Sequence, residues 1–215
     1  MATVRKPMFG SMPRRGNYGA RWRRGMFGGP SSGAAILLSD LFPEANGTNL
    51  SGKALTGGTW TVHGGSGWDV QSGQANPTAE PGGGLWATAV ANAGVASVRM
   101  SVKTASFYGG LIGRAVDVDN YWLLAHNSTA MGINERTAAG GYVERATGAS
   151  SLAAGHRLEF EFRGNVITAR HYDAAEVLQL ELTFTSATHN TATNFGIAAI
   201  GVSADARLDE FYVYA

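Results

Sequence analysis

The sequence predicts an all-β protein built as an antiparallel two-sheet sandwich, and three observations support the prediction. Of 215 residues, 30 are glycine and only 15% are charged, a balance that suits short strands and tight turns better than long helices. Several segments alternate apolar and polar side chains with a period of two. No window has a convincing helical period, so about a dozen strands must pack on one another, most economically in two sheets.

The alternation is clearest in three segments. Residues 98–103 alternate without a fault, residues 157–163 place Leu158, Phe160 and Phe162 on one side, and residues 178–184 form a stripe of leucine and phenylalanine. The Gly164-Asn165 turn predicts a hairpin between its flanking strands. Glycine, asparagine or proline separates the further predicted strands, which cover residues 59–63, 68–71, 85–90, 107–116, 121–126, 142–146, 166–172, 195–202 and 208–214.

The length of the chain suits one good hydrophobic core, and we expect a sandwich domain at residues 34–215 after a separate segment at residues 1–33. The absence of cysteine excludes disulfides, a thiolate nucleophile and a thiolate zinc site. No uncharged apolar stretch approaches the roughly 20 residues of a membrane span, and prolines and arginines interrupt any secretory core near the N-terminus. We therefore expect synthesis and folding in a cytoplasm and no membrane partner.

Charge divides the chain at Asp40, the first acidic residue. Of the 17 basic residues, seven precede Asp40, whereas the other ten and all 16 acidic residues lie from Asp40 onward, so the first segment carries +7 and the remainder −6. The first segment also repeats itself, because Met-Phe-Gly at residues 8–10 recurs at 26–28 and Arg-Arg-Gly at 14–16 recurs at 23–25. Such asymmetry is typical of two functional pieces.

Residues 1–33 have too few apolar side chains for a core and too many glycines for a lone helix, so we expect them to be disordered until a partner binds them. Fully extended, they reach on the order of 110 Å, far enough to cross a neighbouring subunit. Three readings stay open: a tail without a partner, a nucleic-acid-binding arm, and an arm that docks onto protein, which we favour over the other two. The predicted anchors are the aromatic and arginine side chains Arg5, Phe9, Arg14, Arg15, Tyr18, Arg21, Trp22, Arg23, Arg24 and Phe27.

Several motifs resemble known proteins. In chain order they are Asp40 with Asn46-Gly47-Thr48 and Leu50, Gly58-Thr59-Trp60, Gly67-Trp68-Asp69-Val70-Gln71-Ser72-Gly73, Gly110-Leu111-Ile112-Gly113-Arg114-Ala115, Asp119-Asn120-Tyr121-Trp122 and Leu208-Asp209-Glu210-Phe211-Tyr212-Val213. Their order resembles the opening, the central strand pair and the closing strand of concanavalin-A-like, laminin-G-like jelly-roll domains, from residue 36 to the C-terminus. Pro-Met-Phe-Gly at 7–10 and the arginine-rich run at 13–25 resemble the beginnings of minor tail proteins of actinobacterial phages. The resemblance implies a virion component with a lectin-like domain, but it identifies no ligand.

Catalytic chemistry has one pair of carboxylates to consider. Glu159 and Glu161 would share a strand face roughly 7 Å apart, as a glycosidase requires. Arg157 and Arg163 share that face, so we expect a solvated row of alternating charge. No nucleophile elbow, phosphate loop or dinucleotide motif is present. We predict that the protein is not an enzyme and has no catalytic residues and no cofactor.

Metal binding has two candidates, and we expect neither to bind. Residues 117–120, Asp-Val-Asp-Asn, offer oxygen ligands of the kind calcium needs, but aspartate and asparagine are also ordinary turn residues, and we expect a turn. The histidines show no ligand pair at spacing i+2 or i+4, so we predict no zinc site. They are scattered along the chain at His63, His126, His156, His171 and His189.

The remaining signal is aromatic, because flat rings could bind sugars. The aromatic residues concerned are Trp60, Trp68, Trp86, Tyr108, Tyr121, Trp122 and Tyr142. We expect most of them to fill the core, since they fall in or beside predicted strands. Trp86 lies beside Gly82-Gly83-Gly84 and Tyr142 follows Gly140-Gly141, so these two are the predicted glycan-binding residues.

These observations together predict a structural virion protein of a phage, most simply a minor tail (tail-tip) protein anchored by its N-terminal arm. Its predicted partners are other virion proteins, further copies of itself in a homo-oligomer such as a trimer, and a host glycan. We do not expect nucleic acid as a partner. The two alternatives are a capsid decoration (cement) protein, located on the head, and a glycan-binding adhesin domain.

Overall fold

The computed structural model describes residues 34–81, 86–104, 109–139, 141–199 and 206–215. The predicted arm with all its anchors lies outside these residues, as does Tyr108. The described residues form strands and turns without an α-helix, so the all-β prediction is confirmed. No helix in this part of the chain is long and apolar enough to cross a membrane.

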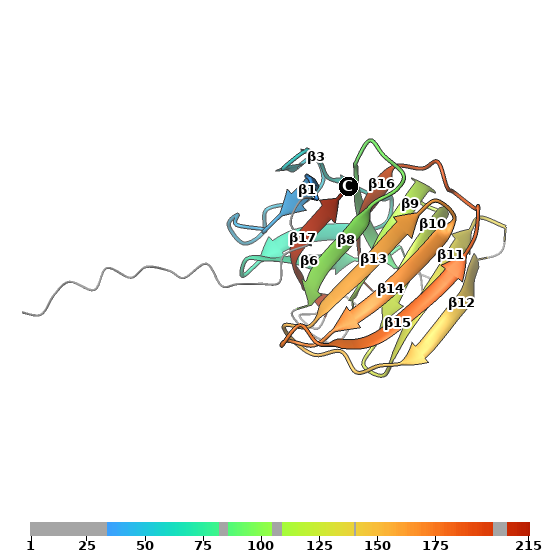
Figure 1. The fold of residues 1–215 in the computed structure, drawn as a ribbon. Coiled ribbons are helices and arrows are strands. Elements are labelled where there is room, and N and C mark those ends of the chain that lie inside the picture. Colours follow the sequence, from blue (N-terminus) through green and yellow to red (C-terminus); the bar gives the residue numbers. More distant parts are fainter. Residues whose placement is uncertain (1–33, 82–85, 105–108, 140, 200–205) are drawn as a thin grey trace, which may run out of the picture.

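Two large antiparallel sheets face each other and form the sandwich (Figure 1). The first sheet has the order β15-β14-β13-β8-β17-β6-β5, with β1 also paired to β17. Its strands are β1 (Ile36–Asp40), β5 (Gly67–Gln71), β6 (Gln74–Ala79), β8 (Arg99–Thr104), β13 (Arg157–Arg163), β14 (Val166–Tyr172), β15 (Leu178–Thr185) and β17 (Leu208–Tyr214).

The second sheet has the order β12-β11-β10-β9-β16-β7-β4. Its strands are β4 (Thr61–Val62), β7 (Ala87–Asn92), β9 (Gly109–Asp117), β10 (Asn120–His126), β11 (Ala130–Thr137), β12 (Gly141–Ala149) and β16 (Asn194–Ala199). β2 (Ala54–Leu55) and β3 (Gly58–Thr59) form a separate two-stranded sheet. The chain passes repeatedly from one sheet to the other, as in a jelly roll.

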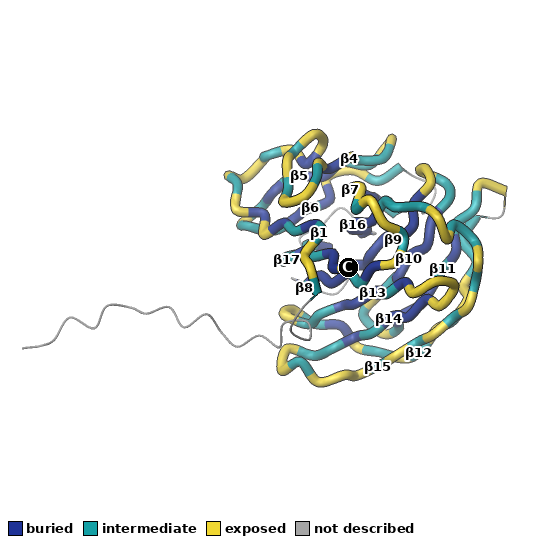
Figure 2. Tube along the Cα trace, turned by 45° about the horizontal axis from the view of Figure 1, so that its top comes forward, coloured by how far each residue is buried: buried dark blue, intermediate teal, exposed yellow. Residues whose placement is uncertain are grey.

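The core lies between the two sheets, where the inward side chains of alternate strand positions meet. Figure 2 shows buried positions along strands of both sheets. Phe160 and Phe162 of β13 are fully buried there, and so is Trp122 of β10. The Phe162 ring packs against the bare backbone of Gly113, because a Cβ at Gly113 would lie 2.3 Å from Phe162 Cε2. This contact explains the glycine inside the β9 motif: any larger residue would push the sheets apart.

Asp40 ties the first strand to the core. One carboxylate oxygen accepts hydrogen bonds from Lys53 Nζ at 2.5 Å and from Trp60 Nε1 at 2.7 Å, and the other accepts one from the Phe42 amide at 2.8 Å. Asp40 is only 5% exposed, so this set of donors is what makes a buried carboxylate tolerable. Asp40 and Trp60, which belong to separate opening motifs of the sequence, therefore form one structural unit.

The observed bounds of β13, β14 and β17 equal the predicted segments, and Gly164 has the positive φ, 55°, of the predicted hairpin turn. Two longer strands were not predicted. β6 contains Pro77, although proline is uncommon inside strands, and β11 has an acidic residue, Glu135, at a buried position. Glu135 is tolerated there because Arg145 of the neighbouring strand donates two hydrogen bonds to it.

Candidate functional site

The outward face of the second sheet carries an apolar cluster at its centre, although a single-sided sandwich pattern would make this face polar. Alternation along β9 and β10 turns Leu111 and Trp122 into the core and turns Ile112, Tyr121 and Leu123 outward. These outward residues are nevertheless only 0%, 2% and 1% exposed, respectively. They belong to a second apolar cluster, distinct from the core between the sheets.

Trp86 and Tyr142 meet on this face. Trp86 directly precedes β7 and Tyr142 lies on β12, yet the Tyr142 hydroxyl accepts a hydrogen bond of 3.2 Å from the Trp86 amide. The same hydroxyl is 2.6 Å from the Tyr121 hydroxyl, and the two phenol rings are 6.3 Å apart in an edge-on arrangement. The Trp86 ring lies over Gly110, where a Cβ would be 3.5 Å from its Cζ3 atom. We call Trp86, Tyr121 and Tyr142 the aromatic platform.

Strand register brings the platform together. Tyr121 of β10 is paired with Arg136 of β11, and Arg136 is paired with Tyr142 of β12. The side chains of Tyr121, Arg136 and Tyr142 therefore lie in one row across three neighbouring strands. Burial raises the pKa of the Tyr121 hydroxyl, and the bond to Tyr142 adds to the rise. The Tyr121 hydroxyl therefore stays neutral and keeps its hydrogen at any physiological pH.

An ion pair borders the platform. The Arg136 guanidinium lies 5.0 Å from the centre of the Tyr142 ring, and its Nη2 donates to Asp119 Oδ1 at 2.7 Å. The hydrogen bond to Asp119 raises the pKa of Arg136 above its ordinary value. The Nε atom of Arg136 is buried without a hydrogen-bond partner among the described residues. Small-ligand sites are typically lined by aromatic rings with a few fixed polar groups beside them.

The predicted aromatic residues divide as follows. Trp60, Trp68 and Trp122 are 1%, 1% and 0% exposed and fill the core, as expected. Trp86 and Tyr142, predicted as the more exposed pair, are half-buried and lie next to each other. Tyr121 is buried, but in the outward cluster rather than between the sheets. The sequence did not reveal that Tyr121 and Arg136 belong to the site. Arg136 lies on β11, between the strands that carry Tyr121 and Tyr142, and β11 was not predicted as a strand.

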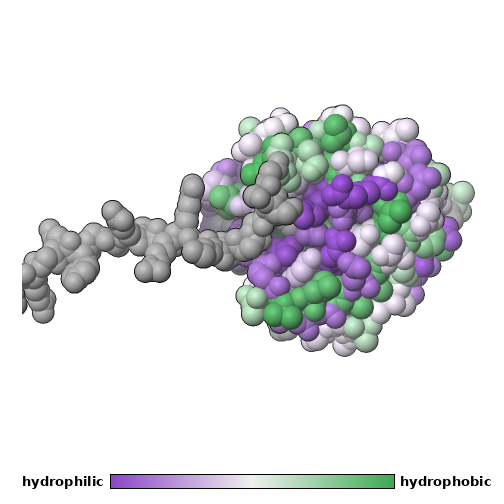
Figure 3. Space-filling model, in the orientation of Figure 1, coloured by the Kyte–Doolittle hydropathy of each residue, from purple (hydrophilic) through white to green (hydrophobic). Residues whose placement is uncertain are grey.

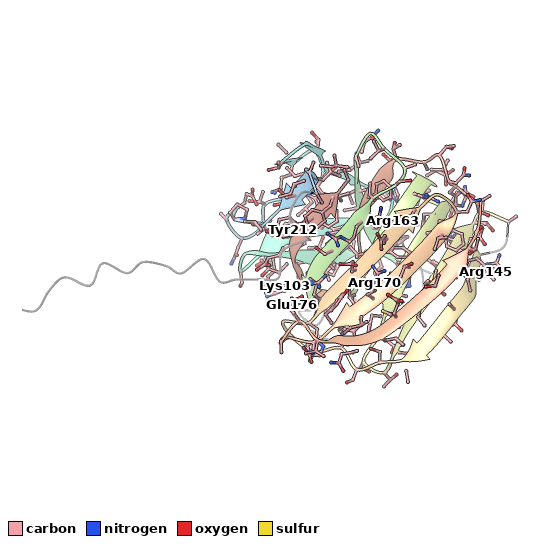
Figure 4. All side chains as sticks on the ribbon, viewed as in Figure 1. Lys103, Arg145, Arg163, Arg170, Glu176 and Tyr212 are labelled. Atoms are coloured by element: carbon pink, nitrogen blue, oxygen red, sulfur yellow. The ribbon has the colours of Figure 1, made fainter. Side chains whose placement is uncertain are left out.

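The glutamates Glu159 and Glu161 lie on the outward face of the first sheet, within a network of arginines. Glu159 accepts hydrogen bonds from Arg157 at 2.9 Å and from Arg170 at 2.7 Å, and Glu161 accepts one from Arg163 at 2.5 Å and one from Arg170 at 2.7 Å. Figure 4 shows Arg163 and Arg170 on this face, and Figure 3 shows hydrophilic side chains gathered over it.

The expectation of a solvated row is wrong for Glu159, which is only 5% exposed because Arg170 of the next strand covers it. Burial alone would raise the pKa of Glu161, but hydrogen bonds from Arg170 and Arg163 hold it below its ordinary value. A glycosidase needs one carboxyl with a raised pKa as its general acid. This pair offers two carboxylates neutralised by arginine instead.

The segment 117–120 forms the predicted turn between β9 and β10. Asp117 Oδ1 accepts hydrogen bonds from the Asp119 amide and from Asn120 Nδ2, both at 2.8 Å, so its carboxylate stabilises the turn itself. No group of three or more histidine, aspartate or glutamate side chains in the described part of the chain is arranged to hold a metal ion. Three of the histidines that are scattered along the sequence, His126, His156 and His171, converge at one end of the sandwich.

No family model matches the chain, and no curated protein matches its sequence. Solved structures do match its fold. A protein of unknown function from Shewanella oneidensis MR-1 has a TM-score of 0.54 at 13% identity, over 83% of this chain and 86% of that one. The CBM2 module of an evolved Dit from Lactobacillus casei BL23 phage J-1 has a TM-score of 0.52 at 8% identity, over 84% and 95%. The exoplasmic/lumenal domain of VIP36, in a form bound to Ca²⁺ and Man3GlcNAc, has a TM-score of 0.50 at 10% identity, over 72% and 82%. The described chain is a concanavalin-A-like jelly-roll sandwich.

Proposed function

We propose that the sandwich is a non-catalytic carbohydrate-binding module and that a saccharide binds at the aromatic platform. The observation that carries the proposal is the meeting of Trp86 and Tyr142 beside the Arg136–Asp119 ion pair. A sugar ring has an apolar face of C–H groups and a rim of hydroxyls. Aromatic rings complement the apolar face, and fixed charged groups complement the hydroxyls.

The platform suits binding because it is held before a ligand arrives. The Tyr142 hydroxyl is bonded to Tyr121 and to the Trp86 backbone, and the Arg136 side chain is held by Asp119. Rigid aromatic side chains lose little conformational entropy on binding, so more of the contact energy appears as affinity. Two structurally similar proteins support the same reading, since one is described as a CBM2 module and the other as bound to Man3GlcNAc.

The test compares two tyrosines on opposite faces. Binding of the full chain to an oligosaccharide array, followed by calorimetry on the best ligand, is measured for the wild type, Tyr142→Ala and Tyr212→Ala. Tyr212 of β17 is half-buried on the first sheet and stacks on Tyr214 with ring centroids 5.8 Å apart, so it controls for loss of an aromatic ring. We expect Tyr142→Ala to weaken binding at least about tenfold, equivalent to about 1.4 kcal/mol, and Tyr212→Ala to leave affinity unchanged. Equal affinities for all three proteins, or no saccharide bound by the wild type, would reject the site.

We further propose that the module is a virion component of a phage, most simply a minor tail protein, anchored by residues 1–33. The charge boundary supports this, because seven basic residues precede Asp40 and a net charge of −6 follows. Arginines pair well with carboxylates of neighbouring subunits, and many small anchors add up through multivalency in a symmetric particle. The fold likeness to a phage Dit module is in keeping with this location.

Deletion of residues 1–33 tests the anchor. The truncated protein should remain folded and soluble but should be missing from purified particles. Normal incorporation of the truncated chain would contradict the proposal. Copy number then separates the tail protein from its rival, since a cement protein covers the head in many copies and a tail-tip protein is present in few.

A further inference from the structure

Four side chains form a continuous hydrogen-bonded chain at one end of the sandwich. His126 Nδ1 is bonded to the Asn127 carbonyl, and His126 Nε2 lies 3.2 Å from Ser150 Oγ. Ser150 Oγ lies 2.5 Å from His171 Nδ1, and His171 Nε2 lies 2.8 Å from His156 Nδ1. His126 and His171 are 0% and 1% exposed, so their ring nitrogens depend on these partners.

The carbonyl at the end of the chain dictates where every hydrogen lies. A carbonyl can only accept, so His126 Nδ1 carries a hydrogen, and the neutral ring then accepts at Nε2 from the Ser150 hydroxyl. Ser150 has spent its one hydrogen, so it accepts from His171 Nδ1, and His171 Nε2 in turn accepts from His156 Nδ1. All donors point the same way, and all three imidazoles are neutral in this arrangement.

The direction of the hydrogen bonds also excludes Ser150 as the nucleophile of a hydrolase. A serine 2.5 Å from a histidine resembles a nucleophile and its base. Here the serine hydrogen points to the buried His126 ring, and His171 donates to the serine oxygen rather than accepting from it. Ser150 is therefore a link in the chain and is not activated for attack.

The hydrogen-bonded row of His126, Ser150, His171 and His156 joins the two sheets. His126 belongs to β10 and Ser150 directly follows β12, both in the second sheet, whereas His171 belongs to β14 and His156 directly precedes β13, both in the first. A pocket of about 210 Å³ opens beside it, lined by Ser150, Ser151, His156, His171, Asp173 and Gln179 among others. Solvent protons can thus reach one end of a buried inter-sheet contact.

Few negative charges near the hydrogen-bonded histidines could stabilise a positively charged ring. Asp173, in the turn after β14, is the acidic group that acts on His171. Its carboxylate already accepts from the Ala175 and Val177 amides and from Gln179. In the same turn Glu176 is bound to Arg157 at 2.7 Å. Among the described residues that line the pocket beside these histidines, Asp173 is the one carboxylate.

We propose that His126, Ser150, His171 and His156 form an acid-sensitive latch between the two sheets, closed while the rings are neutral and opened by protonation of His126 and His171. His156 takes part in the hydrogen-bonded chain through Nδ1 only. A proton added to His126 or His171 disrupts the chain, because both nitrogens of each ring already take part in a directed bond. With a hydrogen on both nitrogens, His126 would point one at the donating Ser150 hydroxyl and His171 would point one at the donating His156 Nδ1, so these partners would have to turn away.

The electrostatics agree with this geometry. Burial, with His156 nearby, lowers the pKa of His171 to about 4, and burial, only partly offset by the bond to the Asn127 carbonyl, lowers that of His126 to about 4. Because the unfolded chain binds protons near pH 6.5, stability is full above that pH and falls as the pH drops toward 4. Between pH 7 and pH 5 the ratio of folded to unfolded protein should fall by about 20-fold for each of the two histidines.

The test measures urea unfolding of the full chain at pH 7 and pH 5 for the wild type, His171→Asn and His189→Asn. His189 lies outside the latch and has a φ of 56°, which asparagine tolerates, so it is the matched control. Between pH 7 and pH 5, the folded-to-unfolded ratio should fall about 20-fold less for His171→Asn than for the wild type. For His189→Asn it should fall as much as for the wild type. Equal pH dependence in all three would overturn the latch.

A second measurement does not depend on a variant that folds. Imidazole resonances of the wild type, followed by NMR from pH 7.5 to 4.5, should show His126 and His171 neutral down to about pH 5. Amide hydrogen exchange at residues 150–156 should then accelerate relative to the rest of the sandwich as the pH approaches 4.5, after correction for the intrinsic rate. Titration of both buried rings near 6.5, without accelerated exchange, would contradict the proposal.

Discussion

Removal of one oxygen atom tests how the aromatic platform is held. In Tyr142→Phe the ring stays, but the Tyr121 hydroxyl loses its partner at 2.6 Å and the Trp86 amide loses its acceptor at 3.2 Å. Tyr121 is 2% exposed, so water cannot easily replace the lost bond. A buried polar group left unpaired costs about 1–3 kcal/mol, and the half-buried Trp86 amide adds less, so we expect a loss of about 2 kcal/mol.

Thermal and urea unfolding at pH 7 measure this loss. For a chain of this length, about 2 kcal/mol corresponds to a decrease of about 4–8 °C in Tm. Tyr212→Phe is the matched control, because its hydroxyl has no hydrogen-bond partner among the described residues, and we expect a change within about 0.5 kcal/mol. If the two variants unfold alike, the hydroxyl bonds do not hold the platform and the reasoning is refuted.

Two further substitutions test the sandwich around the site, both by urea unfolding. Gly113→Ala should lower the free energy of unfolding by about 1–3 kcal/mol, because the new methyl group would lie 2.3 Å from Phe162 Cε2. Gly64→Ala is the control and should be neutral, since nothing lies within 4 Å of the added Cβ. Equal stabilities of the two variants would contradict this packing. Glu159→Gln should also cost about 1–3 kcal/mol, since it removes the most buried counter-charge of Arg157 and Arg170, which keep only the more exposed Glu176 and Glu161 with Glu181, respectively. An unchanged midpoint would show that Glu159 contributes nothing to stability.

Much of the fold could be predicted from local pattern, because strands with one buried face alternate visibly. The segments 157–163, 166–172 and 208–214 have the predicted bounds for this reason. β6 and β11 could not be recognised, since Pro77 and Glu135 contradict a strand or a buried position by local rules. Both depend on partners elsewhere: β6 pairs with β5, and Arg145 neutralises Glu135.

The site was only partly accessible from sequence. Glycine-rich neighbours drew attention to Trp86 and Tyr142, which the fold brings together across the second sheet. The contributions of Tyr121 and Arg136 depend on the register of β10, β11 and β12, which no local pattern reveals. The histidine latch is likewise a product of topology, because spacing along the chain gives no sign that His126 and His171 are neighbours.

Ligand mapping on the intact protein tests the central claim most directly. A titration of the labelled full chain with the tightest oligosaccharide, followed by NMR, should shift the Trp86 indole and the ring resonances of Tyr142 first and most strongly. Resonances of Tyr212 and Arg170 on the opposite sheet should stay in place. Shifts concentrated on that opposite face, with the platform unchanged, would contradict carbohydrate binding at the second sheet.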